Sequence, residues 1–417
     1  NLPTAWDTAT GSGVVVAVLD TGYRPHADLN ANILPGYDMI SNLSVANDGG
    51  GRDSDARDPG DAVAANECGT NGAQNSSWHG THVAGTVAAV TNNGEGVAGV
   101  AYNAKVVPVR VLGKCGGLTS DIADGIIWAS GGSVSGIPAN SNPADVINMS
   151  LGGSGSCSST TQNAINTARS NGTVVVIAAG NDNDNSANYN PGNCNGVVNV
   201  ASVGRNGGRA YYSNYGSNID VAAPGGAQSF ANDSEGVLST YNSGSSTPSS
   251  DSYGFSQGTS MAAPHVAGVA ALIKQAKPDA TPDEIESILK STTRSFPATC
   301  TSCGTGIVDA AAAVAAASGG TTPPTGGDSE LINGEAKTGL SGAANAQAFY
   351  TMTVPSGATN VTFTMSGGTG DADMYVRFGS MPTTSTYDCR PYLNGNNESC
   401  AGTSNNGTYY VLVNGYS

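Results

Sequence analysis

Short runs of consecutive apolar residues, many of them β-branched, recur through the first three quarters of the chain. A strand that is exposed on one face alternates apolar with polar residues, whereas a strand buried on both faces is apolar throughout. The runs therefore predict buried parallel strands at 14–19, 106–112, 146–149, 174–179 and 197–203.

Helical stretches lie between these runs, at 80–90, 120–130, 158–171 and 260–275. The segment Thr281-Pro282-Asp283-Glu284 is a capping box with proline at the first helical position, so a further helix should begin there. Alternation of strands and helices predicts an α/β fold with a doubly wound, mostly parallel sheet. Such sheets bind ligands beyond the carboxyl ends of their strands. Asp20, Ser150 and Asn181 all lie at the carboxyl ends of predicted strands.

The character of the sequence changes after residue 317. A Gly/Pro/Thr linker is predicted at 318–329. The residues beyond it alternate apolar with polar positions in short segments between turn residues, which predicts a small C-terminal antiparallel β-sandwich. We therefore expect an α/β domain at 1–317 and the sandwich at 330–417. The sequence stops directly after a strand, which leaves open whether the sandwich has its last strand.

Composition narrows the classes of partner. The chain has 417 residues, with 16 Lys and Arg against 32 Asp and Glu, for a formal charge of −16. Phosphate binding requires clustered cations, so nucleic acid is not expected as a partner. No apolar stretch reaches the length of a membrane span, so no membrane association is expected. The first residues lack a charged and then apolar leader, as in a processed chain whose targeting signal and pro-segment have been removed.

Eight cysteines without zinc-finger spacing indicate an oxidising compartment, and hence secretion. Eight cysteines allow 105 pairings. Proximity in the sequence favours Cys300 with Cys303, and Cys389 with Cys400. The remaining cysteines then give Cys68 with Cys115 and Cys157 with Cys194 as plausible pairs.

Four residues carry the groups that acyl transfer by a serine requires: a nucleophile, a base, a carboxylate that orients the base, and a donor for the oxyanion. Ser260 stands at the start of a predicted helix, and His79 opens another. Asp20 ends an apolar strand, and Asn181 follows a strand. Taken singly, Ser260 could be an ordinary helix cap, and Asp20 and Asn181 ordinary turn residues. For His79 the alternative is a metal site with His82, but no H-E-x-x-H pattern accompanies the pair.

Together, these residues and their surroundings resemble the subtilisin-like serine proteases. The resemblance rests on the segments Asp20-Thr21-Gly22, His79-Gly80-Thr81-His82-Val83-Ala84-Gly85, Ala178-Ala179-Gly180-Asn181 and Gly258-Thr259-Ser260-Met261-Ala262-Ala263-Pro264. The order Asp, His, Ser is the subtilisin order. The resemblance implies that Ser260 attacks the peptide carbonyl, that His79 is the general base and then the acid, and that Asp20 fixes its tautomer. Asn181 and the Ser260 N–H would hold the oxyanion.

The resemblance also implies how a substrate binds. Its backbone would add as a strand between two enzyme segments, which match Ser150-Leu151-Gly152-Gly153 and the segment containing Leu112, Gly113 and Gly116. The side chain before the scissile bond would enter a pocket lined by Ala178, Ala179 and Gly180. Asp182 near this pocket would favour a basic side chain or would simply be solvated, so the cleavage preference stays open.

Structural calcium is a further implication of the resemblance. One site would use Asp28 with Val90, Asn92 and Asn93, although the loop after Val90 is one residue longer than the family pattern. A second candidate is the acidic loop with Asp53, Arg57, Asp58 and Asp61, for which a solvated loop is the alternative.

The C-terminal segment resembles the bacterial pre-peptidase C-terminal domain, through Asp371-Ala372-Asp373-Met374-Tyr375-Val376 and Thr408-Tyr409-Tyr410-Val411-Leu412-Val413. The sequence as a whole predicts a secreted, monomeric serine endopeptidase of broad specificity. Two alternatives compete with this prediction. A binding protein on a dead protease fold would lack a triad member, and an esterase would need a G-x-S-x-G elbow, where this chain has Ala262 in the last position.

Overall fold

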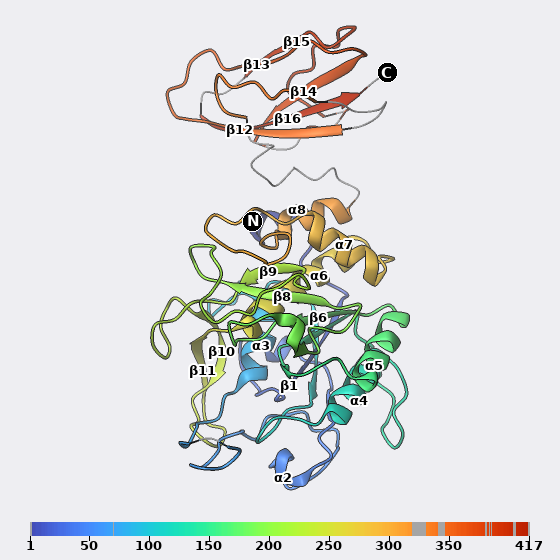
Figure 1. The fold of residues 1–417 in the computed structure, drawn as a ribbon, viewed down its shortest axis with the longest axis vertical. Helices are drawn as coiled ribbons and strands as arrows, with labels where there is room; N and C mark the ends of the chain where they lie inside the picture. Colours follow the sequence, from blue (N-terminus) through green and yellow to red (C-terminus); the bar gives the residue numbers. More distant parts are fainter. Residues whose placement is uncertain are drawn as a thin grey trace. The chain divides into compact units, whose positions relative to one another are not determined.

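The computed structural model describes residues 2–69, 71–318, 331–340, 347–379, 382, 384, 386–402 and 406–415. The chain divides into two compact units, residues 1–320 and 321–417 (Figure 1). Each unit is described by itself. The predicted linker, apart from Ser318, and the last two residues lie outside the described residues. The bounds expected for the domains therefore stay a prediction.

A seven-stranded parallel sheet forms the centre of the first unit, in the order β2-β3-β1-β4-β6-β8-β9. The strands are β2 (Tyr37–Asp38), β3 (Lys105–Arg110), β1 (Val15–Asp20), β4 (Val146–Met149), β6 (Val174–Ala178), β8 (Val198–Val203) and β9 (Val221–Pro224). The five inner strands are those that the apolar runs predict. The edge strand β2 has two residues, too few for a recognisable run, and β9 (VAAP) has one β-branched residue followed by two alanines and a proline.

The first unit also contains eight helices and four strands outside the central sheet among its described residues. The helices are α1 (Leu2–Trp6), α2 (Leu43–Ala46), α3 (His79–Ala88), α4 (Thr119–Ala129), α5 (Ser159–Ser170), α6 (Thr259–Ala276), α7 (Pro282–Ser291) and α8 (Ala310–Ala317), with 3-10 turns η1 (Asn30–Asn32) and η2 (Ser186–Asn188). Two antiparallel pairs join β5 (Gly153–Ser154) to β7 (Tyr189–Asn190), and β10 (Val237–Asn242) to β11 (Asp251–Ser256).

The sheet is buried on both faces, which explains its uninterrupted apolar strands. In β1, Val16 and Val18 belong to a core cluster with residues of α3 and α6. The intervening Ala17 and Leu19 belong to a second cluster, with residues of α4 and α5. Successive side chains point to opposite faces of a strand, so one strand supplies both clusters. The doubly wound α/β fold is thereby confirmed.

Two antiparallel sheets make up the second unit. One has the order β12-β16-β14 and the other pairs β13 with β15. The strands are β12 (Gln347–Val354), β13 (Thr362–Met365), β14 (Ala372–Phe378), β15 (Glu398–Ala401) and β16 (Gly407–Gly415). Phe363 of β13 packs against Tyr409 of β16, and both belong to one core cluster. This arrangement confirms the antiparallel sandwich.

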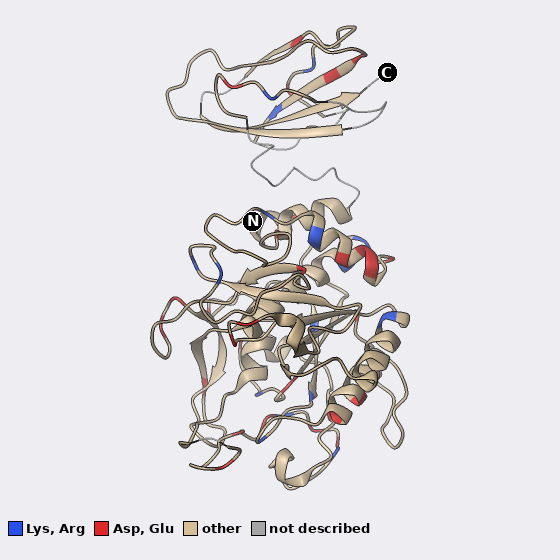
Figure 2. Ribbon diagram, in the orientation of Figure 1, with Lys and Arg blue, Asp and Glu red and all other residues tan. Residues whose placement is uncertain are grey.

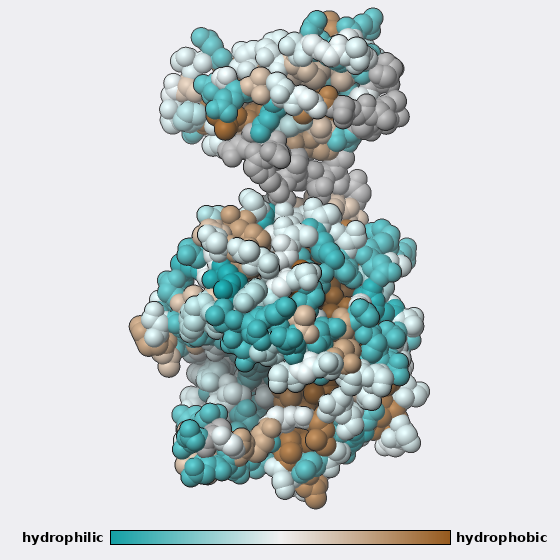
Figure 3. All heavy atoms as spheres, viewed as in Figure 1, coloured by the Kyte–Doolittle hydropathy of each residue, from teal (hydrophilic) through white to brown (hydrophobic). Residues whose placement is uncertain are grey.

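All eight cysteines are paired, as Cys68–Cys115, Cys157–Cys194, Cys300–Cys303 and Cys389–Cys400. Lys and Arg are scattered over the ribbon rather than gathered on one face (Figure 2). Polar side chains cover much of the visible face, and apolar ones form small patches (Figure 3). Among the described residues, no helix combines the length and the apolar character that crossing a membrane requires.

Candidate active site

Asp20 and His79 meet at the carboxyl end of the central sheet. Asp20 is the last residue of β1 and is fully buried. His79 is the first residue of α3, and its Nδ1 lies 2.8 and 2.9 Å from the two carboxylate oxygens of Asp20. A buried carboxylate requires a hydrogen-bonded partner, and the imidazole N–H provides one. The contact therefore places the proton on Nδ1 and leaves Nε2 as the free acceptor.

A glycine permits this close approach of α3 to β1. A Cβ at Gly80 would lie 2.0 Å from the carbonyl oxygen of Gly22 and 3.1 Å from the Cβ of Asp20. Its backbone N–H donates to Thr21 Oγ1 at 3.1 Å. Any larger residue at this position would push the helix start, and His79 with it, away from Asp20.

Charges around the imidazole raise the pKa of His79 above its usual range. Burial by itself lowers this pKa, but the charge and the hydrogen bond of Asp20 raise it more. The carboxylates of Asp61 and Asp58 add to the increase. Nearby negative charge favours the imidazolium form, which is the form that a general base becomes during catalysis.

Ser260 reaches the same edge from α6, which packs against the same face of the sheet as α3. It is the second residue of α6, where the first N–H groups have no partner within the helix. Its Oγ donates to the carbonyl oxygen of Ser150 at 3.3 Å, and Ser150 Oγ donates to the Ser260 carbonyl oxygen at 2.7 Å. Ser150 follows β4, so α6 is fixed against the end of that strand.

Asn181 is held by the residue before the serine. Its Oδ1 accepts from the N–H of Thr259 at 2.8 Å and from Thr259 Oγ1 at 3.0 Å. A Cβ at Gly258 would lie 3.5 Å from both Asn181 Nδ2 and the Ser260 nitrogen. The two candidate oxyanion donors therefore flank one space, which the glycine keeps open.

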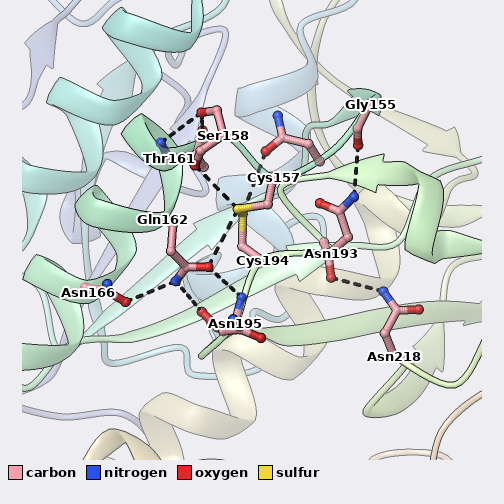
Figure 4. Close-up of a disulfide and its surroundings, with 12 residues drawn as sticks. Gly155, Cys157, Ser158, Thr161, Gln162, Asn166, Asn193, Cys194, Asn195 and Asn218 are labelled. Atoms are coloured by element: carbon pink, nitrogen blue, oxygen red, sulfur yellow. Dashed lines mark hydrogen bonds between the residues drawn. A yellow bond between two sulfur atoms is a disulfide. The ribbon is translucent and has the colours of Figure 1, made fainter.

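The segment Ser150–Gly153 runs into a short antiparallel strand pair, β5 with β7. Gly153 in β5 pairs with Asn190 in β7. The disulfide Cys157–Cys194 ties the loops that follow these two strands (Figure 4). Around it, Gln162 bonds both backbone groups of Asn195, at 2.9 and 3.0 Å. Covalent and polar contacts thus hold the strand pair next to Gly152 and Gly153.

The second predicted substrate segment forms a tight turn. Gly113 and Gly116 exchange two backbone hydrogen bonds of 3.0 Å. Between them, Cys115 is joined by a disulfide to Cys68, which follows the acidic loop. A Cβ at Gly113 would lie 2.2 Å from the Val45 carbonyl oxygen, so the turn after Leu112 requires this glycine.

Ala178, Ala179 and Gly180 lie where β6 ends, beside Asn214. Gly180 has φ +104°, and a Cβ there would lie 2.2 Å from Asn214 Nδ2. Asn214 donates to the Ala179 carbonyl oxygen at 3.0 Å and accepts from the N–H groups of Asp182 and Asp184. No local sequence pattern indicates a role for this asparagine, because its partners are 30 or more residues away.

A hollow of about 400 Å³ lies beside His79 and borders part of the site. Both the imidazole of His79 and Ser150 border it, together with the turn at Leu112 and Gly113. Its remaining lining residues are Thr21, Asp61, Val63, Cys68, Gln74, Ser77, Cys115 and Gly116.

Two residues of the first calcium candidate, Val90 and Asn93, contact Asp28. Asp28 is fully buried, and its Oδ1 accepts from Asn93 Nδ2 at 2.6 Å. The N–H of Val97 donates to Oδ2 at 3.0 Å, and that of Val90 to the Asp28 carbonyl oxygen at 2.7 Å. Within the described part of the chain, no cationic side chain pairs with this carboxylate. A buried carboxylate requires a neutralising partner. If the side-chain amide of Asn93 is flipped, its oxygen rather than its nitrogen faces Asp28. Oxygen ligands of this kind fit calcium.

The acidic loop does not assemble a comparable site. The Arg57 guanidinium is paired with Asp55. Asp58 bonds Thr21 and Gly60, and Asp61 bonds Ser77. No group of three or more potential metal-ligating side chains converges among the described residues, here or elsewhere. Burial raises the pKa of Asp58 to about 6.

His82, one turn after His79, lies in the core. Its Nε2 bonds the carbonyl oxygens of Val237 and Gly254 at 2.9 and 3.1 Å. Burial lowers its pKa to about 4, so it is neutral near pH 7. These contacts hold α3 against the β10–β11 hairpin.

Known proteins match both units of the chain. A model of the subtilase family matches residues 11–306, and one of the bacterial pre-peptidase C-terminal domain matches residues 347–415. An "Extracellular protease" of Xanthomonas campestris pv. campestris is 60% identical over 421 residues, which cover 100% of this chain and 71% of the relative. An "Extracellular basic protease" of Dichelobacter nodosus is 50% identical over 73% of this chain and 51% of its own length.

Better-known relatives and a solved structure agree with these matches. "Subtilisin Savinase" of Lederbergia lenta is 39% identical over 72% of this chain and 90% of its own length. The crystal structure of a cold adapted subtilisin-like serine proteinase matches with a TM-score of 0.52 and 31% identity, over 72% of this chain and 88% of that one. The chain belongs to the subtilase family of serine endopeptidases.

Proposed function

We propose that the chain is a secreted endopeptidase that hydrolyses peptide bonds of proteins through Ser260, His79 and Asp20. The hydrogen bond between His79 Nδ1 and Asp20 carries the proposal, because it leaves Nε2 free to accept a proton. Ser260 Oγ attacks the substrate carbonyl carbon while its proton passes to His79 Nε2. The imidazolium then gives this proton to the leaving amine, and an acyl-enzyme ester remains. Water, deprotonated by His79, hydrolyses the ester and restores the serine.

The tetrahedral intermediate carries a negative oxygen, for which Asn181 Nδ2 and the Ser260 N–H are the proposed donors. Their support is the shared space at Gly258 and the fixing of Asn181 Oδ1 by Thr259. The helix α6 adds the positive end of its dipole at Ser260.

Substrate binding follows from the two glycine-containing segments. We propose that an extended substrate lies between Ser150–Gly153 and the turn at Leu112, Gly113 and Gly116, bonded through its backbone. Backbone pairing reads little of the side chains, which supports broad specificity. The side chain before the scissile bond would enter the pocket at Ala178, Ala179 and Gly180.

The same resemblance supports further proposals about the molecule. Relatives named extracellular proteases and the four disulfides support secretion. A pro-segment removed during maturation and a monomeric state are expected of a subtilase, with proteins or peptides as substrates and neither nucleic acid nor membrane as partner. Calcium, where bound, would be held by Asp28 with Val90, Asn92 and Asn93, and would neutralise the buried carboxylate.

The test of this function compares wild type with Ser260→Ala in casein hydrolysis. Loss of the nucleophile should lower turnover by about 10⁶-fold, the scale known from subtilisin. A Ser291→Ala variant, changed at an exposed position of α7, serves as the matched control and should keep full activity. Equal hydrolysis by wild type and Ser260→Ala would refute the proposed nucleophile. A folded but inert wild type would favour the binding-protein alternative.

A further inference from the structure

The hollow beside His79 has a carboxylate on its wall that the proposed reaction does not use. Asp61 borders this hollow together with Ser77 and His79. Its side chain is half-buried, so it meets both the protein and the substrate space. A charge in this position faces whatever side chain the substrate brings next to the base.

The hydrogen bonds of Asp61 leave acceptor capacity. Ser77 donates twice, from its N–H to Oδ1 at 2.6 Å and from its Oγ to Oδ2 at 2.7 Å. A carboxylate offers about four lone-pair sites, so each oxygen can accept once more. These bonds also fix the direction of the carboxylate, because both oxygens are held by one residue next to His79.

No described cation neutralises this carboxylate. Its hydrogen-bond partner is a serine, and none of the ion pairs among the described residues includes Asp61. Lys114, next to Cys115 of the hollow, bonds Glu67 at 2.8 Å instead. The hollow is therefore negatively charged on the side of Asp61.

The position of the hollow identifies the substrate residue that it would receive. The following step rests on the proposed function, in which an extended substrate lies along the Leu112 turn. Side chains of an extended chain point alternately to opposite sides. If the residue before the scissile bond enters the pocket at Ala178–Gly180, the one before it points to the other side, toward His79 and Leu112.

We propose that Asp61 makes this subsite selective for lysine or arginine at the second position before the scissile bond. The aliphatic stem of such a side chain would lie along Leu112 and Val63, and its cationic end would reach Asp61. The volume of about 400 Å³ accommodates a long side chain. Recognition of the substrate backbone alone would not distinguish between side chains at this second position.

The experiment uses two peptides that differ only at this position, one with lysine and one with norleucine, its uncharged counterpart. Wild type should cleave the lysine peptide with a kcat/KM about tenfold higher, the scale of one charge-assisted hydrogen bond. The ratio should fall toward one in Asp61→Asn and should also fall as salt is added. Because a ratio is compared, a general change in the rate of the variant cancels.

Asp53→Asn is the control. It also removes one negative charge from the acidic loop, but Asp53 does not line the hollow. It should keep the wild-type ratio. Equal cleavage of both peptides by wild type, or an unchanged ratio in Asp61→Asn, would overturn the role of Asp61. Cleavage of neither peptide, with casein also intact, would instead count against the proposed function.

Discussion

The imidazole of His79 is surrounded by carboxylates that act on it differently. Asp20 bonds it directly, whereas Asp61 and Asp58 act through charge. Asp58 is itself buried, with a pKa of about 6, so its charge appears only as the pH rises through that value. The protonation of the base is thus set by several groups, of which one is also proposed to meet the substrate.

Removal of one of these charges should move the pH profile in a defined direction. A general base works when neutral, so the acid limb of kcat/KM follows the pKa of His79 in the free enzyme. Asp61→Asn removes a negative charge that raises this pKa. We expect the acid limb, measured with the norleucine peptide, to move to lower pH. An acid limb that stays in place, or moves to higher pH, would contradict the electrostatic role of Asp61, and Asp53→Asn should leave the limb unchanged.

The elements are specified partly by their own residues and partly by their neighbours. Helix α7 is an example of local specification. Thr281 Oγ1 accepts from the Glu284 N–H at 3.2 Å, and the Glu284 carboxylate accepts from the Thr281 N–H at 2.9 Å. Ile285 and Leu289 then turn a buried face toward the rest of the unit. The start of this helix could therefore be predicted from four consecutive residues.

Loss of the cap should have a measurable cost. Thr281→Ala, made in the inactive Ser260→Ala background to avoid self-digestion, should lower the free energy of unfolding by about 1 kcal/mol. Urea unfolding measures this difference. Ser291→Ala in the same background, at the exposed end of the same helix, should change it little. A cost for Thr281→Ala no larger than that for Ser291→Ala would show that the capping box does not stabilise α7.

Other elements could not be predicted because distant residues determine them. The inner strands of the sheet were recognisable from their apolar runs, but β2 and β15 depend on partners far along the chain. At the site, the sequence indicated His79, Asp20, Ser260 and Asn181 as types of residue in suitable places. It did not indicate that Thr259 fixes Asn181, or that Asp61 borders the hollow, since both follow from contacts between separate loops.

At the scale of the whole molecule, the excess of carboxylates leads us to expect that stability depends on cations. The formal charge is −16, and one carboxylate, Asp28, is buried without an ion-pair partner among the described residues. A cation bound only to the folded state stabilises it by mass action, by about 2.7 kcal/mol at a hundred times the Kd. The proposed calcium site would therefore act on the stability of the peptidase unit as a whole.

Chelation should lower the thermal midpoint of the Ser260→Ala protein. In the Ser260→Ala background, Asp28→Asn should lower the thermal midpoint measured with calcium present. The midpoint of this variant should no longer respond to chelator, because Asp28 is the charged ligand of the proposed site. Asp53→Asn should keep the response. The same midpoint in calcium and in chelator would refute the proposal, and a response lost only in Asp53→Asn would assign the ion to the acidic loop.

The disulfide Cys68–Cys115 closes a covalent ring that contains His79 and the whole of α3. Exposed residues 71–75 lie inside this ring, on the surface that neighbouring protease molecules can attack. One cut there would open the ring without releasing a fragment, since the two pieces would stay joined through the sulfur atoms. An ageing preparation of this enzyme could thus carry internal cuts that a gel reveals only after reduction of the disulfide. Such a chain would withstand cleavage by other copies of the enzyme longer than a chain without the disulfide.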